Sequence, residues 1–303
     1  MIILDVCYII GAMKGVVIVN QYIGHNQYKI DRFYEEFPKL GIDFDVVSND
    51  GTLARIKDSK VIVNIPKCDF VIYLDKDIYL ARLLERAGYR LFNRADFIKM
   101  CDDKMLTFIN CANLDIKMPE TIAGPLVYTE LEDKNYDFLY KIETELGFPL
   151  IVKRVYGSLG EGVYLAHNME ELSELYSKIY RNPLLFQKYV PSKYGKSIRV
   201  LIIDGKVVGG FVRYNKDDFR SNYGDNANGE LLDNPKDCYE FSQRIADLLK
   251  IEYAGIDLLL EPDGKPTLCE INSNAFFEEF EKVTGINVAY KIGEMIKNKL
   301  ENE

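Results

Sequence analysis

The chain has 303 residues, 48% hydrophobic and 28% charged, a balance typical of globular proteins with sizeable cores. Its net charge is −9, with no polybasic run and no apolar run of about 18 residues, so neither nucleic acid nor a membrane is an expected partner. The six cysteines are scattered and form no CxxC pair, which indicates reduced thiols in a cytoplasmic protein. The only histidines are His25 and His167, which excludes a histidine-rich zinc site.

Residues 1–93 alternate between β-rich and helical patterns. Strands are expected at 15–20, 42–50, 61–65, 70–73 and 89–92, and helices at 30–40 and 78–87. This alternation favours a small parallel sheet covered by helices, that is, an N-terminal α/β domain. No GxGxxG follows the first strand, so a dinucleotide site is not supported. Asn20, Tyr22 and His25 follow a strand end, where open sheets bind ligands, although each taken singly is more simply an ordinary polar loop residue.

The middle of the chain combines a helix with a glycine-rich loop. Residues 93–113 predict one helix, on which Asp102, Asp103 and Lys104 are interpreted as a solvated face. Further on, a strand at 148–153 ends on Lys153, a charge in an apolar run, and GSLGEG at 157–162 leads into a strand at 163–166. Backbone N–H groups of such a loop can cover phosphates, although most loops of this kind are plain hairpins.

Two further strands bring a pair of arginines together. Asp204-Gly205 is a strong hairpin signal between the strands 197–203 and 206–213. Arg199 and Arg213 are therefore expected to lie near each other without being directly paired. A polar loop at 218–229 and a helix at 234–249 follow.

The stretch 253–275 predicts an antiparallel hairpin that carries two carboxylates. Pro262-Asp263-Gly264 separates two apolar runs, and closing the hairpin with Glu261 opposite Pro266 places Asp257 opposite Glu270. Alternation puts Asn272 on the same face as Glu270. Two carboxylates across a ladder repel at about 5 Å, and a divalent cation would compensate, since these oxygens suit Mg²⁺. A solvated polar face is the alternative interpretation.

These segments, in this order, resemble the ATP-grasp ligases. Lys104, FPLIVKRVYGSLGEGV, LLFQKYV, SIRVLII, DFRSN, AGIDLL and CEINSN carry the resemblance, and the tail EKVTGINVAYKI is similar to the RimK-like glutamate-ligase branch. The resemblance covers about residues 94–295. It implies an ATP-grasp fold of α+β lobes behind an N-terminal, Rossmann-like pre-ATP-grasp α/β domain at 1–93, with a central subdomain at 94–186 and a C-terminal subdomain at 187–303.

The resemblance also implies roles for individual residues. Those that would bind ATP through the phosphates, the flap and the adenine hinge are Lys104, Lys153, Gly157, Ser158, Gly160, Gly162, Gln187, Lys188, Tyr189 and Val190. Asp257, Glu270 and Asn272 would hold two Mg²⁺ ions, with Mn²⁺ as the alternative metal. Arg199, Arg213 and Asn222 would face the γ-phosphate and the acyl phosphate, which makes them the catalytic set. Lys188 and Ser197 depart from the family, which usually has acids at both positions, and Ser273–Phe277 replaces its usual Ser-Pro-Gly turn.

The activity implied is ATP-dependent amide formation between a carboxylate and an amine. Its expected partners are a glutamate-like amino acid and a carboxylate acceptor on a peptide, protein tail or cofactor, and homo-oligomers are left open. Phosphoryl transfer depends mainly on positioning and charge, so lysines, arginines and Mg²⁺ suffice without a protein nucleophile. The alternatives are an ATP-grasp small-molecule kinase and a non-catalytic nucleotide-binding protein.

Overall fold

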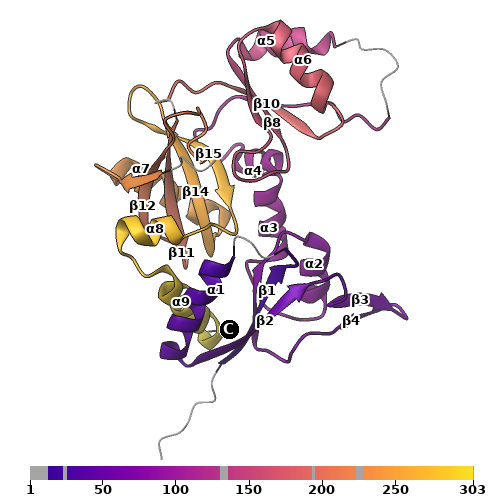
Figure 1. Cartoon of the computed structure of the whole chain (residues 1–303), viewed down its shortest axis with the longest axis vertical. Helices are drawn as coiled ribbons and strands as arrows, with labels where there is room; N and C mark the ends of the chain where they lie inside the picture. Colours follow the sequence, from indigo (N-terminus) through magenta and orange to yellow (C-terminus); the bar gives the residue numbers. More distant parts are fainter. Residues whose placement is uncertain (1–12, 23–25, 130–135, 193–194, 223–227, 303) are drawn as a thin grey trace, which may run out of the picture. The chain divides into compact units, whose positions relative to one another are not determined.

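The computed structural model describes residues 13–22, 26–129, 136–192, 195–222 and 228–302, so His25 lies outside the described residues. The chain divides into two compact units, one formed by residues 1–95 with 287–303 and the other by residues 96–286. Figure 1 labels the helices and strands of both units along the chain.

The first unit contains a parallel four-stranded sheet in the order β2-β1-β5-β6. Val16 to Val19 of the central strand β1 are fully buried, because helices cover the sheet. The strands are β1 Met13–Asn20, β2 Ile42–Asn49, β5 Phe70–Leu74 and β6 Leu91–Phe92. The helices are α1 Gln27–Glu36, the 3₁₀ helix η1 Phe37–Leu40, α2 Ile78–Arg86 and α9 Val288–Asn302. The predicted small parallel sheet with helices is confirmed.

One strand of this region was assigned wrongly from the sequence. The run at 61–65 does not join the parallel sheet but forms an antiparallel hairpin of β3 Ala54–Lys57 with β4 Lys60–Val63. Asp58 and Ser59 between them both have positive φ, as a tight two-residue hairpin turn requires. Asp-Ser is a weaker turn signal than Asp-Gly, and the β-rich pattern alone does not distinguish a parallel strand from a hairpin.

The C-terminal helix α9 also differs from the predicted domain organisation. The sequence grouped 187–303 together, whereas residues 287–303 belong to the first unit, where α9 packs on α1 and η1. Gly293 lies so close to Leu40 that a Cβ on it would come within 2.6 Å of the Leu40 Cδ1 atom. The last helix therefore stabilises the first unit, although it follows the second unit in the sequence.

The second unit contains two antiparallel sheets with separate cores. The first has the order β7-β10-β8-β9, and α5 and α6 lie side by side against it (Figure 1). Its core gathers Leu139, Leu150, Leu172 and Phe186. The elements are β7 Thr121–Ala123, α5 Phe138–Leu146, β8 Leu150–Arg154, β9 Val163–Ala166, α6 Met169–Ile179 and β10 Leu184–Lys188.

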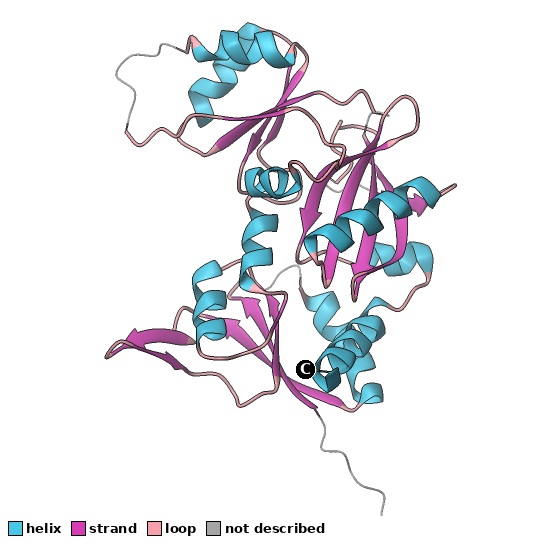
Figure 2. Ribbon diagram, turned by 180° about the vertical axis from the view of Figure 1, so that it is seen from behind, coloured by secondary structure: helices cyan, strands magenta, loops and turns pink. Residues whose placement is uncertain are grey.

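The other sheet has five strands in the order β13-β12-β11-β14-β15, and α7 packs on one of its faces (Figure 2). Ile198, Ile245 and Ile256 lie in the core between them. The elements are β11 Lys196–Ile203, β12 Lys206–Tyr214, β13 Asn228–Leu231, α7 Lys236–Leu249, β14 Tyr253–Leu260, β15 Pro266–Asn272 and α8 Glu278–Thr284. β13 lies partly in the stretch predicted as a polar loop.

The single helix predicted at 93–113 is two helices, α3 Ala95–Asp102 and α4 Lys104–Cys111. The Asp103 carboxylate accepts a hydrogen bond from the Leu106 N–H and so caps the start of α4. This break takes Lys104 out of a solvated helix face and leaves it 7% exposed. The interpretation of Lys104 as a surface residue is therefore wrong.

All five cysteines in the described part of the chain, Cys68, Cys101, Cys111, Cys238 and Cys269, are free thiols. Among the described residues, no helix combines the length and the apolar character needed to cross a bilayer.

Candidate active site

One cavity in the second unit collects most of the residues singled out from the sequence. Its wall includes strands of both sheets, the glycine-rich loop between β8 and β9, and the segment after β12. The predicted site residues that line it are Lys104, Lys153, Gly157, Ser158, Gly160, Gln187, Lys188, Tyr189, Val190, Arg213, Asn222, Asp257 and Glu270. Gly162, Arg199 and Asn272 are not in the lining. Apolar side chains, among them Ile151, Val163 and Leu259, make up another part of the wall.

The β14–β15 hairpin forms one wall with the predicted register. Asp257 lies directly opposite Glu270, and Asn272 lies opposite Gly255. The closing pair is Leu260 with Pro266 rather than Glu261 with Pro266, and a register shift after Asp257 leaves Cys269 as an extra residue on β15. Such a bulge twists the strand locally. The carboxylate pair predicted from the turn sequence is therefore confirmed, although the strands reach it through an irregular ladder.

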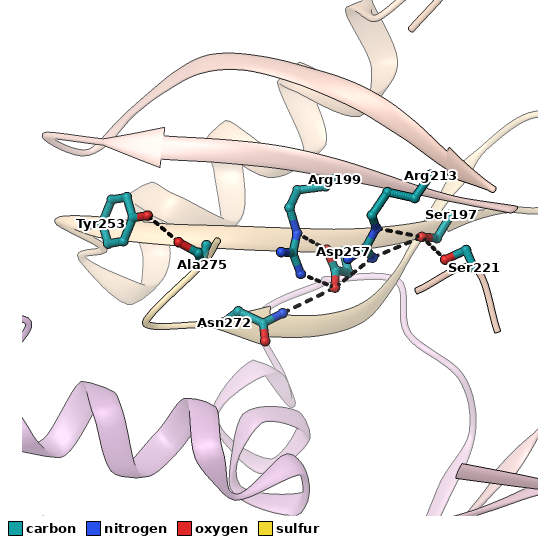
Figure 3. A network of polar contacts seen from close by, with 8 residues as sticks. All are labelled: Ser197, Arg199, Arg213, Ser221, Tyr253, Asp257, Asn272 and Ala275. Carbon is teal, nitrogen blue, oxygen red and sulfur yellow. Dashed lines mark hydrogen bonds and ion pairs between the residues drawn. The ribbon is translucent and has the colours of Figure 1, made fainter. Parts of the chain in front are cut away.

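Two buried arginines converge on Asp257, as Figure 3 shows. Arg199, its cross-strand neighbour on β11, donates from Nε and Nη2 to the two carboxylate oxygens, each at 2.8 Å. The Nη2 of Arg213 lies 2.9 Å from Oδ2 of Asp257. The three side chains are almost completely removed from water. Both guanidiniums depend on one carboxylate for charge compensation.

The pKa values of these groups follow from burial and from each other. Burial disfavours the charged carboxylate of Asp257, but Arg199 and Arg213 outweigh burial and hold its pKa below the ordinary value. Burial also acts against the charge of Arg199, yet Asp257 raises its pKa. Burial and the neighbouring Arg199 both lower the pKa of Arg213. Asp257 is therefore ionised at neutral pH, while Arg213 is the less compensated cation.

The two predicted lysines, Lys104 and Lys153, both line the cavity. The Lys104 Nζ donates to the Gly157 carbonyl at 2.7 Å and lies 3.5 Å from a Glu270 oxygen. Lys153 is 9% exposed, lines the cavity and forms no salt bridge with the described residues. A buried ammonium without an ionic partner is costly, so the cavity is suited to an anion.

The glycine-rich loop at 157–162 is held at several points. Gly157, Gly160 and Gly162 have positive φ, and Leu159 shares this unusual conformation for a residue with a side chain. Arg220 donates to the Gly160 carbonyl at 3.0 Å, and Asp218 accepts from Arg220 at 2.7 and 2.9 Å. From the sequence, Arg220 is noted only as part of the motif DFRSN. Its contact with the glycine-rich loop could not be inferred from that motif.

The segment predicted as the adenine hinge starts at the end of β10. Gln187 is buried, and its side-chain amide donates to the Thr121 hydroxyl at 2.8 Å. The backbone N–H of Lys188 bonds the Glu120 carbonyl at 3.0 Å, and its ammonium lies 3.8 Å from the Glu120 carboxylate. The unusual lysine is thus accompanied by a neighbouring acid.

The donor set on β14 and β15 fits a hard divalent cation. Asn272 donates its amide N–H to Asp257 at 3.2 Å, which leaves its carbonyl oxygen as an acceptor, and Glu270 has a partly exposed side chain. In the described part of the chain no three Asp, Glu, His or Cys side chains form a ready metal cage. Two carboxylates and an amide with few further ligands are what Mg²⁺ accepts alongside phosphate oxygens and water.

The segment after Asn272 is fixed by the fold. The Tyr253 hydroxyl donates to the Ala275 carbonyl at 2.7 Å (Figure 3). A Cβ at Gly255 would lie 2.8 Å from the Ala275 Cβ and 3.3 Å from the Arg199 Nε atom. Glycine at this position therefore lets the segment and the arginine approach β14 closely.

The two antiparallel sheets of the second unit, with a cavity lined from both and a glycine-rich loop over it, define an ATP-grasp fold. The chain belongs to the family of RimK-like ATP-grasp domains, whose model matches residues 101–296.

Comparisons with individual proteins agree with this family. The chain is 29% identical over 270 residues to beta-citrylglutamate synthase B of Danio rerio, covering 86% of this chain and 65% of that protein. It is 32% identical over 244 residues to N-acetylaspartylglutamate synthase A of Homo sapiens, covering 80% and 60%. The chain thus spans about three fifths of the length of these curated relatives.

Solved structures share the fold at low sequence identity. D-alanine–D-alanine ligase from Bacillus anthracis, complexed with ATP, superposes with a TM-score of 0.71 at 22% identity, covering 96% of this chain and 98% of that one. A RimK domain ATP-grasp protein from Sphaerobacter thermophilus gives a TM-score of 0.70 at 17% identity, covering 92% and 98%. At such identities the likeness concerns the fold alone.

Proposed function

We propose that the protein is an ATP-dependent carboxylate–amine ligase that forms an amide bond through an acyl phosphate. The observation that carries the proposal is the clustering of Lys104, Lys153 and Arg213 with Asp257 and Glu270 in one cavity. These cations can bind and neutralise a polyphosphate. The apolar wall of the cavity suits a base, and Gln187 to Val190 are proposed as its hinge.

The reaction needs charge stabilisation more than proton transfer. A substrate carboxylate oxygen attacks the γ-phosphorus, the bond to the bridging oxygen breaks, and ADP leaves with the electron pair. The amine nitrogen then attacks the acyl carbon, phosphate leaves, and an amine proton is lost to solvent. Arg199, Arg213 and Asn222 are proposed to orient the transferred group. The histidine in the described part of the chain, His167, is exposed and does not line the cavity.

Asp257, Glu270 and Asn272 are proposed to hold two Mg²⁺ ions, with Mn²⁺ as the alternative. When bound, the metal neutralises phosphate oxygens during transfer. Lys104 at the start of α4 and Lys153 on β8 of the other sheet are proposed to complete the charge compensation. Lys104 also ties the glycine-rich loop to this site through its bond to the Gly157 carbonyl.

The proposed amine is a glutamate-like amino acid, joined to a small carboxylate, a peptide, a protein tail or a cofactor. The relatives support this choice, since the names beta-citrylglutamate synthase and N-acetylaspartylglutamate synthase both include glutamate. A cytoplasmic location is proposed with it, because the described cysteines are reduced.

The test is ADP and phosphate release with Mg-ATP over a panel of amino acids and carboxylates, with mass spectrometry of the products. Amide product formed in step with ADP and phosphate supports the ligase. Phosphorylated carboxylate or alcohol with no amine consumed would identify a kinase instead, and nucleotide binding without turnover on any pair would favour a regulatory protein. Lys153→Met should abolish turnover, whereas Lys265→Met on the exposed hairpin turn should not change it.

A further inference from the structure

A pair of buried serines extends the arginine network toward the cavity. Ser197 on β11 lies directly opposite Arg213 on β12, and its hydroxyl oxygen accepts from Arg213 Nη2 at 3.0 Å and from Nε at 3.3 Å. The Ser197 oxygen also lies 2.5 Å from the Ser221 hydroxyl oxygen. Figure 3 shows the chain of contacts from Asp257 through Arg213 and Ser197 to Ser221. Both serines are at least nine-tenths buried and both line the cavity.

The hydrogen-bond capacity of Ser197 fixes the direction of this chain. A hydroxyl has one donor and two acceptor lone pairs, and a guanidinium can only donate. Two N–H groups of Arg213 occupy the acceptor side of Ser197, so the Ser197 proton is donated to Ser221. The Ser221 oxygen is then an acceptor, and its own proton is turned to another partner. Within the described part of the chain, the Ser221 hydroxyl has no further hydrogen-bond partner besides Ser197.

Arg213 points donors in the same direction. Its Nε atom contacts Ser197, and its Nη2 atom contacts both Ser197 and Asp257. Neither N–H of Nη1 bonds a described residue. A hydroxyl that accepts from a neighbour polarised by a cation becomes a stronger donor. The cavity therefore offers an anion two adjacent donor groups, the Arg213 Nη1 and the Ser221 O–H.

We propose that Ser197 and Ser221 form a hydroxyl relay in which Ser197 positions Arg213 and Ser221 donates to an anionic phosphate oxygen of the bound nucleotide. The proposal rests on the proposed function and adds Ser221 to the phosphate-binding groups. In the alternative, the two serines only tie the segment after β12 to β11. A mere tether would influence every ligand of the cavity alike, whereas the relay acts on phosphate alone.

The experiment is calorimetric titration of the full chain with Mg-ATP, Mg-ADP and adenosine. Wild type is compared with Ser197→Ala, Ser221→Ala, the double variant and Ser221→Thr, which keeps the hydroxyl. Ser242→Ala is the matched control, because Ser242 is fully buried in α7 and its hydroxyl has no partner among the described residues. Melting of each unliganded variant reports its fold.

The relay predicts that either alanine variant loses about tenfold to a hundredfold in affinity for the phosphorylated nucleotides, the range for a hydrogen bond to a charged group. Adenosine affinity should stay within about twofold of wild type, and Ser221→Thr should recover most of the lost nucleotide affinity. The double variant should bind the phosphorylated nucleotides only slightly more weakly than the single alanine variant of lower affinity. Losses that add, or that affect adenosine equally, overturn the relay. A wild-type protein that binds no nucleotide refutes the proposed function itself, and Ser242→Ala should bind as wild type in every case.

Discussion

Asp257 is the shared ion-pair partner of two buried arginines in the second unit. It is 2% exposed and is the one carboxylate to which both Arg199 and Arg213 are bonded. Asp257→Asn keeps the shape but leaves two buried guanidiniums facing a neutral amide. Removing one partner of a buried ion network costs about 3–5 kcal/mol. Because the Glu270 carboxylate lies directly opposite Asp257 on β15, we expect the lower end, about 3 kcal/mol.

For a unit of this size that loss corresponds to a fall in melting temperature of about 6–12 °C. The pH dependence has a definite sign. The folded pKa of Asp257 lies below its unfolded value, so its contribution is complete above the unfolded pKa of about 3.9 and is lost as the pH falls through the folded value. The stability difference between wild type and variant should therefore be full at pH 7 and shrink below about pH 4.

Urea unfolding at pH 7 and at a series of acidic pH values measures this difference directly. Glu240→Gln is the matched control, since Glu240 is exposed on α7 and its ion-pair partner among the described residues is Lys236, four residues away. That pair should contribute less than about 0.5 kcal/mol. An Asp257→Asn variant as stable as Glu240→Gln would refute the assignment of Asp257 as the shared counter-ion of the two arginines.

Three other substitutions test separate parts of the molecule. Glu270→Ala should lower metal-dependent turnover by at least about a hundredfold while the protein still folds, and normal turnover would remove Glu270 from the metal set. Gly162→Ala should slow turnover and cost about 1 kcal/mol, because φ is +74° and the new Cβ would lie 2.8 Å from Arg154 Cδ; wild-type kinetics would show that the loop tolerates the strain. Gly293→Leu should destabilise the first unit by about 1–3 kcal/mol through overlap with Leu40, and unchanged urea unfolding would contradict the packing of α9 on η1.

The carboxylate pair could be predicted from sequence because its causes are local. Pro262-Asp263-Gly264 fixes the turn, and the alternation of apolar residues fixes which face Asp257 and Glu270 share. The bulge at Cys269 could not be predicted, since the extra residue changes neither the turn signal nor the apolar pattern near the turn. The predicted pairing of Asp257 with Glu270 is nevertheless correct, because the pairing next to the turn is shifted by one residue, to Leu260 with Pro266, and the bulge reverses this shift.

The helix break at Asp103 shows a different limit. The apolar pattern continues across Asp102–Lys104, so periodicity alone predicts one helix. The deciding event is the capping of α4 by Asp103, and the burial of Lys104 against Gly157 comes from a segment more than fifty residues away. The contacts of Arg220 with the glycine-rich loop and of Ser197 with Ser221 are equally non-local. Their residues carry no local pattern that marks them.

The charge distribution around the candidate site favours a ligand of high negative charge. The chain as a whole is at −9, yet in the described part of the site the cations Lys104, Lys153, Arg199 and Arg213 lie near two carboxylates, Asp257 and Glu270. Two unit charges about 4 Å apart interact by about 4 kcal/mol near a protein surface, so an unmatched cation is expensive. The arginines share Asp257 and Lys104 lies beside Glu270, which leaves Lys153 and part of Arg213 uncompensated. Binding a polyphosphate would relieve this imbalance, so affinity for the proposed nucleotide would come from charge that the described residues leave uncompensated.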